Sequence, residues 1–242
     1  MRIIRIICFL FILAAVPFTN NITASDIPGD IKDSASEIMN ITLLPGDDIQ
    51  KAIDSIADCG TLTLKAGSYD TLDSIVISGR SNLVLEGIGE VWINTKGIDH
   101  HVITLTECNN ITLTNIKAQH EILEEGDNAP IADATDGAVV GILGGSNINI
   151  INCELVGCGI YGVYAKSATP VLLDGCYLHD NSECAILFVA GAKTMYAEIK
   201  DCMIMKNADS IEVRGDIELD MAGENNIEHN SPGDYSRRQP NN

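Results

Sequence analysis

The sequence predicts an all-β protein, a single-stranded parallel β-solenoid with a short capping helix near its N-terminal end. Two observations lead to this prediction. Pairs of apolar residues separated by one residue recur along the 242-residue chain, which is the pattern of short strands repeated in a solenoid. Aromatic residues make up only 5% of the chain, so stacked aliphatic side chains and cysteines must supply most of the core.

The first residues have the pattern of a secretory signal peptide. Arg2 and Arg5 precede an apolar run over residues 6–16, and polar residues lead to Ala24, where we expect cleavage. An uncleaved N-terminal anchor is the alternative, although the run is short for a transmembrane span. We expect the mature chain to be secreted, periplasmic or on the cell surface, without membrane insertion. Removing residues 1–24 deletes two arginines and no acid, which changes the formal net charge from -19 to -21.

The capping helix is predicted immediately before the first strands. Apolar residues recur at helical spacing over residues 49–56, and Asp47 or Asp48 is placed to cap this helix. Gly60 follows, and residues 61–64 then alternate with the period of a strand. We therefore divide the chain into a signal peptide (1–24), an N-terminal segment (25–43), the solenoid domain (44–230) and a polar tail expected to be disordered (231–242).

Each repeat contains three short strands. One strand of each repeat begins at Leu83, Ile111, Ile148, Val171, Ala197 and Ile217. The third strand of each repeat begins at Ile75, Ile103, Ala138, Ile160, Ile186 and Ile211, and these strands form what we call the third-strand sheet. A further inward position follows the first of these sets, occupied by Ile88, Ile116, Cys153, Cys176 and Cys202. In a parallel solenoid each turn buries its inward residues against the next turn and pairs its backbone with it.

A leucine-rich repeat is the alternative architecture. The stretch Ile148-x-Ile150-x-x-Cys153-x-Leu155 matches much of that motif. Gly145, however, stands where the motif has leucine, and residues 159–164 are rich in glycine and β-branched residues, which does not indicate a helix. The sequence therefore favours the β-solenoid.

The N-terminal part of the repeat region resembles a known family. Ile49-Gln50-x-Ala52-Ile53, followed by Gly60-Thr61-Leu62-Thr63-Leu64-x-x-Gly67-x-Tyr69, resembles the N-terminal cap and first turn of right-handed parallel β-helix proteins. These form the pectate lyase-like superfamily, and the resemblance covers roughly residues 44–230. It implies a right-handed solenoid that binds polysaccharide, where it binds any, on the outer face of the third-strand sheet. Hydrolases of the superfamily place aspartate pairs there, and lyases place calcium-binding carboxylates and an Arg or Lys base.

Alternation predicts two outward rows on this third-strand sheet. The rows are Val76, Thr104, Val139, Tyr161, Leu187 and Glu212, and Ser78, Thr106, Gly141, Val163, Val189 and Arg214. Only Glu212 and Arg214 carry charge, which makes them catalytic candidates, but two carboxylates flanking a glycosidic bond are missing. An apolar stripe of this kind predicts a covered face or a partner surface. Tyr161 and Tyr164 are candidates for stacking on a sugar ring.

Asp136 is a third catalytic candidate. The segment Thr135-Asp136-Gly137 resembles the stretch that carries a catalytic aspartate in polygalacturonases, but the chain lacks the other motifs of those enzymes. An Asp-Gly turn is also an ordinary way to enter a strand.

A long insertion over residues 119–135 is the richest cluster of acids in the repeat region. Carboxylates of this density could hold Ca²⁺, which prefers six to eight oxygen ligands. A solvated acidic loop is the alternative, because no EF-hand spacing is present. The candidate calcium ligands are Glu121, Glu124, Glu125, Asp127, Asp133 and Asp136.

The cysteines occupy repeat positions and are expected to form part of the core. Three of them share the inward position described above, where small thiols pack well. Cys158 and Cys184 occupy a second repeat position and are the candidate disulfide pair, since stacked residues lie within reach of each other. No Cys-x-x-Cys pair is present, so zinc is not expected.

Two functions remain open from the sequence. The net charge of -19 disfavours nucleic acid as a partner. The first hypothesis is a non-catalytic module that binds a glycan or a partner, such as an acidic polysaccharide or a surface protein. The second is a small Ca²⁺-dependent polysaccharide lyase or another carbohydrate-active enzyme. The His179-Asp180-Asn181 and His100-His101 stretches are interpreted as solvated turn residues.

Overall fold

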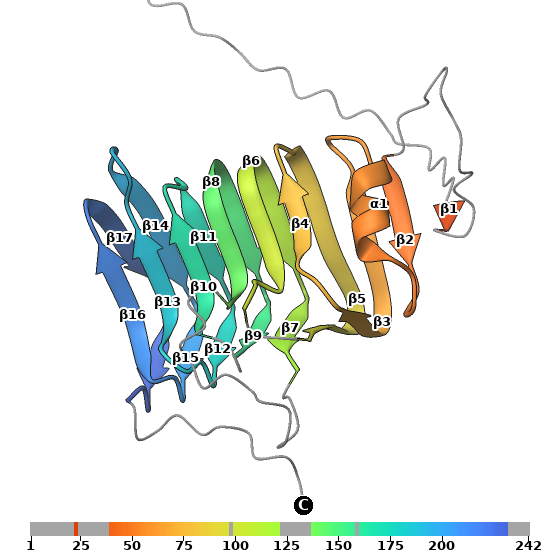
Figure 1. The fold of residues 1–242 in the computed structure, drawn as a ribbon. Helices are drawn as coiled ribbons and strands as arrows, with labels where there is room; N and C mark the ends of the chain where they lie inside the picture. Colours follow the sequence, from red (N-terminus) through yellow and green to blue (C-terminus); the bar gives the residue numbers. More distant parts are fainter. Residues whose placement is uncertain (1–21, 24–38, 97–98, 122–136, 158–159, 232–242) are drawn as a thin grey trace, which may run out of the picture.

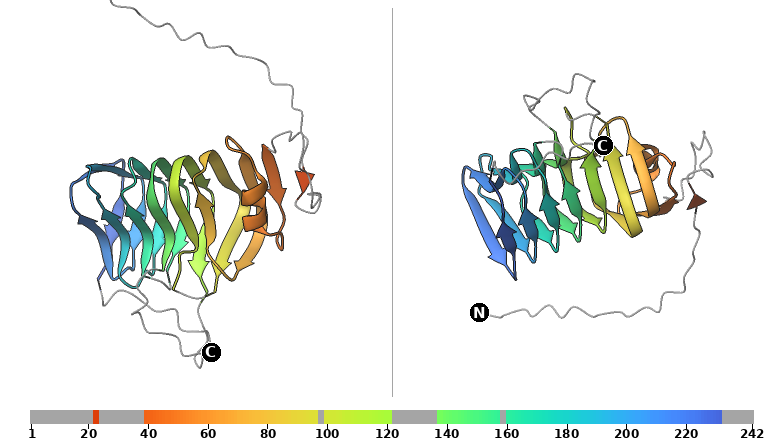
Figure 2. Two further views of the ribbon diagram at one scale, coloured as in Figure 1. Left: turned by 45° about the horizontal axis from the view of Figure 1, so that its top comes forward. Right: turned by 90° about the horizontal axis from the view of Figure 1, so that it is seen from below.

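Strands of successive turns pair in parallel and build three sheets that run along the molecule (Figures 1 and 2). The computed structural model describes residues 22–23, 39–96, 99–121, 137–157 and 160–231. It shows a parallel β-solenoid of about seven turns with one short helix, which confirms the predicted fold class. The second half of each repeat is a strand, so the leucine-rich alternative is wrong. No helix among the described residues is long and apolar enough to cross a membrane.

Each sheet takes one strand from each turn. Sheet one contains β4 (Ile75–Ser78), the first halves of β6 (Ile103–Thr114) and β8 (Ala138–Ile151), β10 (Tyr161–Lys166), β13 (Cys184–Val189) and β16 (Asp209–Arg214). Sheet two contains β2 (Asn40–Leu43), the first halves of β3 (Thr61–Thr71) and β5 (Ser81–Thr95), the second halves of β6 and β8, β11 (Val171–Asp174), β14 (Met195–Lys200) and β17 (Ile217–Ala222). Sheet three contains the second halves of β3 and β5, β7 (Lys117–His120), β9 (Glu154–Val156), β12 (Tyr177–His179), β15 (Met203–Met205) and β18 (Asn226–Glu228).

The core is a stack of aliphatic rows inside the three sheets. Equivalent inward residues lie directly above one another because the strands pair in register. One such row, fully buried, is Leu62, Leu85, Leu113, Ile150, Leu173 and Ile199. Among the described core residues only Tyr69 and Phe188 are aromatic, which agrees with the 5% aromatic content of the chain.

Asparagines recur at the corners, where the backbone must turn sharply. Asn115 and Asn152, between sheets two and three, have φ of 55° and 51°, a left-handed conformation that asparagine tolerates better than most residues. At the corner after sheet three, the amide of Asn181 donates to Asn207 over 2.7 Å, and that of Asn207 donates to Asn230 over 2.8 Å. This ladder pairs side-chain amides that the corner would otherwise leave without partners.

The helix α1 (Ile49–Ser55) closes the N-terminal end of sheet one. Asp48 caps it by accepting a hydrogen bond from the Lys51 amide, as predicted. The side-chain amide of Gln50 then pairs with the outer edge of β4: its Nε2 donates to the Val76 carbonyl (3.0 Å), and its Oε1 accepts from the Val76 amide (2.8 Å). An open strand edge is a site for unwanted pairing, and this contact occupies it.

Two short strands lie before the predicted start of the solenoid at residue 44. β2 pairs with β3 and is therefore the first strand of sheet two. β1 (Ile22–Thr23) pairs in parallel with β2, although these two residues belong to the segment predicted to be a signal peptide.

Sheet one is the third-strand sheet of the sequence analysis. Its predicted outward rows are wrong in the middle of the molecule. The register aligns Gly141 and Tyr164 with Thr104 in one outward row, whereas Val139 and Val163, expected outside, are buried. The residues around Val139 are all apolar, so alternation is invisible there. The row is displaced by two residues at Val139 and by three at Tyr161, and an odd displacement moves a side chain to the other face.

The cysteine ladder is present in the core, although Ile88, which was expected to begin this inward row, is 48% exposed. Cys153, Cys176 and Cys202 stack in one buried row. Cys184 has a free, buried thiol, and the register places Tyr161 beside it. Cys158 lies outside the described residues.

The Gln50 contact generates a first prediction. Replacing Gln50 with Ala removes both hydrogen bonds to the β4 edge and should lower the free energy of unfolding by about 1 kcal/mol. Urea denaturation of the folded chain measures this. Lys51→Ala, on the exposed face of the same helix, is the control and should cost less. Equal losses in the two variants would show that the edge contact does not stabilise the solenoid.

Candidate functional site

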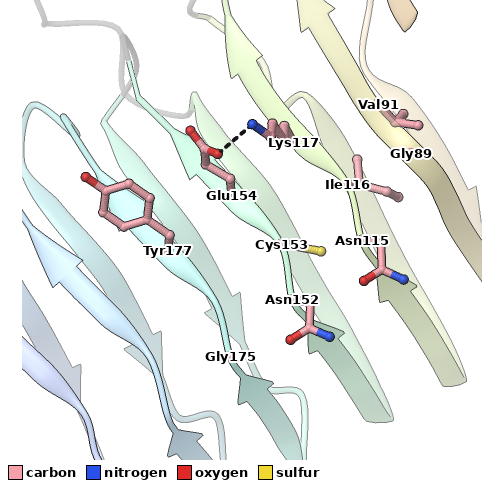
Figure 3. A pocket seen from close by; sticks show the side chains of 10 residues that line it. All are labelled: Gly89, Val91, Asn115, Ile116, Lys117, Asn152, Cys153, Glu154, Gly175 and Tyr177. Carbon is pink, nitrogen blue, oxygen red and sulfur yellow. Dashed lines mark ion pairs between the residues drawn. The ribbon is translucent and has the colours of Figure 1, made fainter. Parts of the chain in front are cut away.

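A groove opens where the chain turns from sheet two into sheet three. Its volume is about 320 Å³, within the range of small-ligand sites. Figure 3 shows the side chains around it, with Lys117 and Glu154 facing each other and Tyr177 beside them. Its lining residues are Gly89, Val91, Asn115, Ile116, Lys117, Asn152, Cys153, Glu154, Gly175 and Tyr177.

The polar side of the groove is formed by Lys117, Glu154 and Tyr177, which belong to one outward row of sheet three; Trp92 is in the same row but does not line the groove. Trp92, Lys117, Glu154 and Tyr177 occupy equivalent positions on four successive turns, because the strands pair Trp92 with Lys117, Lys117 with Glu154, and Glu154 with Tyr177. The stacking of the solenoid therefore brings together four residues spread over 86 positions of sequence. None of them was among the predicted site residues.

Lys117 is held by contacts on three sides. Its Nζ lies 3.1 Å from Glu90 Oε1, 3.2 Å from Glu154 Oε2 and 5.0 Å from the centre of the Trp92 ring. The ring adds a cation–π contact to the two ion pairs. The hydrogen bond to Glu90, followed by that to Glu154, raises the pKa of Lys117. The ammonium therefore stays charged and fixed, a good hydrogen-bond donor and a poor base.

Tyr177 is held in turn by a histidine between two carboxylates. Its ring stacks on His179 with 4.0 Å between the ring centres. His179 Nδ1 lies 2.6 Å from Asp180 Oδ2, and its Nε2 lies 3.3 Å from Glu154 Oε1. The interpretation of His179 as a solvated turn residue is wrong, since only 6% of it is exposed. This network fixes the orientation of both Tyr177 and Glu154 on the groove wall.

Amide side chains line the other end of the groove. Asn115 and Asn152 stand at equivalent corners of successive turns (Figure 3). At the next turn the corner is Gly175, and a Cβ there would lie 2.4 Å from Asn152 Oδ1. The glycine therefore keeps space for the asparagine amide. The groove thus combines an aromatic ring, a charged pair and amide groups.

A polar ladder extends from the groove along sheet three. The amide of Asn94 donates to Ser68 over 2.7 Å and to Asp70 over 2.8 Å, and Gln119 donates to the Asn94 carbonyl oxygen over 2.9 Å. The hydrogen bonds from Asn94, and then that from Ser68, lower the pKa of Asp70. The outer face of this sheet is therefore polar over several turns.

The predicted sugar-stacking tyrosines lie on a different sheet. The rings of Tyr161 and Tyr164 stack on sheet one with 6.0 Å between centres, and His101 lies 6.1 Å from Tyr164. Tyr161 donates a hydrogen bond to Glu183 over 2.9 Å, and burial, followed by this carboxylate, raises its pKa. The apolar stripe expected beside them is not open, since Leu187 is 2% exposed.

The charged candidates of sheet one lie on the last turn. Glu212 and Arg214 form an ion pair with each other over 2.7 Å. The hydrogen bond that Arg214 donates to Glu212 raises the pKa of Arg214, so the guanidinium stays protonated. A lyase base must lose its proton to act, which Arg214 does not support.

The predicted calcium ligands lie almost entirely outside the described residues. Glu124, Glu125, Asp127, Asp133 and Asp136 are in this category, and so is the catalytic role predicted for Asp136. Glu121 is described, and its Oε2 lies 4.0 Å from Lys96 Nζ. Within the described part of the chain, no three His, Cys, Asp or Glu side chains are grouped to hold a metal ion.

Three histidines meet at the end of β7. His120 is fully buried, and its Nε2 donates to the His100 carbonyl over 2.9 Å. His100 Nδ1 lies 2.8 Å from Asp99 Oδ1, and His101 Nδ1 accepts from the Ala138 amide over 3.0 Å. Burial lowers the pKa of His120 to about 4, which keeps the ring neutral.

The comparisons with known proteins bear on the fold. The family model described as "Right handed beta helix region" matches residues 69–231. Among solved structures, ORF18 of Geobacillus virus E2 is similar, with a TM-score of 0.59 and 16% identity. The match covers 85% of this chain and 40% of the viral chain, so this chain spans less than half of that protein. At this identity the similarity shows the fold alone. No curated protein matches the sequence.

His120 generates a prediction about acid stability. Its pKa is about 4 in the folded protein against 6.5 ordinarily, so the unfolded chain binds a proton between these values and the folded chain does not. The free energy of unfolding should therefore fall as pH drops from about 6.5 to about 4, by about 3 kcal/mol from this residue. Urea denaturation across this range measures the slope.

The matched variants are His120→Gln and His229→Asn. Glutamine can keep a hydrogen bond to the His100 carbonyl but does not titrate, so the slope should flatten in that variant. His229 is exposed and has a φ of 54°, which asparagine tolerates, so its variant should keep the full slope. A wild-type slope retained in His120→Gln would contradict the prediction.

Proposed function

The chain belongs to the right-handed β-helix family, and we propose that it binds glycans through the groove of sheet three without converting them. The single observation that carries the proposal is the outward row of Trp92, Lys117, Glu154 and Tyr177 beside a groove of about 320 Å³. Sugars present an apolar ring face and a rim of hydroxyls. An aromatic side chain next to fixed polar groups suits both.

The polar groups are held before any ligand arrives. Lys117 and Glu154 fix each other over 3.2 Å, and His179 supports Glu154 and Tyr177 together. Side chains that are already ordered lose little conformational entropy on binding, which favours affinity. The amides of Asn115 and Asn152 add donors and acceptors at the other end of the groove.

The negative charge of the protein around the groove favours an uncharged glycan as the ligand. The chain has a net charge of -19, and around the groove the carboxylates of Glu90, Glu154 and Asp180 outnumber the ammonium of Lys117. An acidic polysaccharide would meet repulsion here. The expectation of an acidic ligand depended on Ca²⁺ bound in the insertion. Of the proposed calcium ligands, only Glu121 lies among the described residues.

Binding is better supported than lyase chemistry. A lyase needs a base that is neutral at working pH, and neighbouring carboxylates raise the pKa of both Lys117 and Arg214. The hydrogen bond from Lys117 lowers the pKa of Glu90. This carboxylate therefore stays ionised and does not supply a general acid. We further propose that the protein acts after export, on the basis of the predicted signal peptide.

The test is titration calorimetry with neutral cello-, xylo-, manno- and chito-oligosaccharides, alongside oligogalacturonate with and without Ca²⁺. A neutral oligosaccharide should bind, and Tyr177→Ala should weaken that binding about tenfold through the lost stacking. Tyr196→Ala is the matched control, because Tyr196 is 49% exposed on the outer face of sheet two, away from the groove.

Other outcomes would contradict the proposal. Binding that depends on Tyr161 and Tyr164 but not on Tyr177 would move the site to sheet one. Unsaturated product from oligogalacturonate, followed by its ultraviolet absorbance and dependent on Ca²⁺, would show a lyase instead of a binding protein.

A further inference from the structure

The two ends of the solenoid are finished differently. At the N-terminal end, α1 lies against β4, and the Gln50 amide occupies the strand edge. At the C-terminal end, β16, β17 and β18 each pair with only one described strand, namely β13, β14 and β15. No described helix or strand covers this end in Figures 1 and 2.

The open end exposes side chains that belong to the core. Val213, Met221 and Ile227 are 50%, 41% and 40% exposed. Their register partners one turn earlier, Phe188, Ile199 and Ile204, are fully buried. The exposed residues of the last turn and their buried partners face the same interior. They differ because no further described turn covers the last one. Exposed apolar surface together with free strand edges is the kind of surface at which proteins associate.

The residues after Ser231 do not have the composition of another turn. They contain no Ile, Leu, Val or Met, and Tyr235 is their one aromatic residue. A further turn would need alternating apolar residues to cover three sheet edges. Residues 232–242 therefore lack the apolar residues that a covering turn requires.

We propose that this end is the interface of a symmetric dimer, in which β16 pairs in antiparallel fashion with β16 of a second copy. A second solenoid end presents the same three open edges, and a twofold axis through β16 places β16 against itself and β17 opposite β18 of the other copy. Such an interface is formed by the same surface of both copies and closes the assembly at two. This inference is independent of the glycan site, which lies on the outer face of sheet three.

The charges of β16 favour one register of this pairing. Opposite residues of an antiparallel pair share a face, so inward Val213 must oppose an inward residue of the partner copy. With Val213 opposite its own copy, Glu212 lies opposite Arg214 twice, once on each side of the axis. With Glu212 opposite its own copy, two like charges meet instead. The sequence Glu212-Val213-Arg214 is therefore self-complementary in one register, and its exposed ion pair, now within one chain, can exchange across the interface.

The remaining charges of the last turn set the strength of the dimer. Apart from Glu212 and Arg214, the charged Asp, Glu, Lys and Arg residues from 209 to 231 are all acidic, namely Asp209, Asp216, Glu218, Asp220, Glu224 and Glu228. Two copies bring these carboxylates together, which opposes association, and salt screens this repulsion. The dimer should therefore be weak at low ionic strength and tighten as salt is added.

Sedimentation velocity over a concentration series, at one fixed moderate salt concentration, tests the proposal. We expect a monomer–dimer equilibrium that Val213→Asp abolishes. Val76→Asp is the matched control, because Val76 is 40% exposed on the outer face of β4 at the opposite end. It adds the same charge and should leave the dimer intact. Far-ultraviolet circular dichroism and the melting temperature check that each variant is folded.

A charge swap tests the register. Glu212→Arg and Arg214→Glu alone each place like charges opposite one another and should weaken the dimer about tenfold. The double variant exchanges the two charges, restores opposite signs across the axis and should return the dissociation constant to that of the original chain. Each single variant changes one of these two side chains and the double variant changes both, so the three variants are matched controls for one another.

Three results would overturn the proposal. One is a monomer at every protein concentration of the series, which would leave the end to a different partner. Another is a dimer insensitive to Val213→Asp, which would place the interface elsewhere. The last is a double variant as weak as the single ones, which would exclude the antiparallel β16 pairing.

Discussion

Parallel backbone pairing between successive turns is the constraint on which the rest of this structure depends. It places equivalent residues of each turn in rows, so that a side chain is chosen by its neighbours one turn before and one turn after. Inside, this produces the aliphatic and cysteine rows of the core. Outside, the same pairing aligns Trp92, Lys117, Glu154 and Tyr177, which no local segment could bring together. The same strand register therefore aligns both the core residues and the groove residues.

The groove depends on restraint as much as on position. Lys117 is fixed by two carboxylates and an aromatic ring, and Tyr177 is fixed by a histidine that two carboxylates hold in turn. These contacts keep donors, acceptors and an apolar ring in place, and they also keep the lysine protonated. The arrangement is therefore suited to holding a polar ligand and unsuited to removing a proton from it.

A stack of turns has two ends, and each must dispose of apolar side chains and strand edges. This chain places a helix and a glutamine amide at one end. At the other it leaves Val213, Met221 and Ile227 partly exposed among acidic residues. The groove lies on the side of the solenoid and this surface lies at its end, so ligand binding and self-association can occur on one molecule.

The sequence by itself determined the class of fold, because period-two apolar pairs recurring with glycine and asparagine corners have few other solutions. It also predicted the capping helix and the buried row of Cys153, Cys176 and Cys202. It could not determine the register around Val139, where every residue is apolar, and the predicted outward rows failed there. The sequence did not predict the groove, because the family resemblance implies a binding site on sheet one. The signal was nevertheless present, because each groove residue precedes an inward residue of sheet three by one position. Only the tertiary structure decided which outward residues meet, because a solenoid makes neighbours of residues one turn apart, and the lengths of the corners set that distance in sequence.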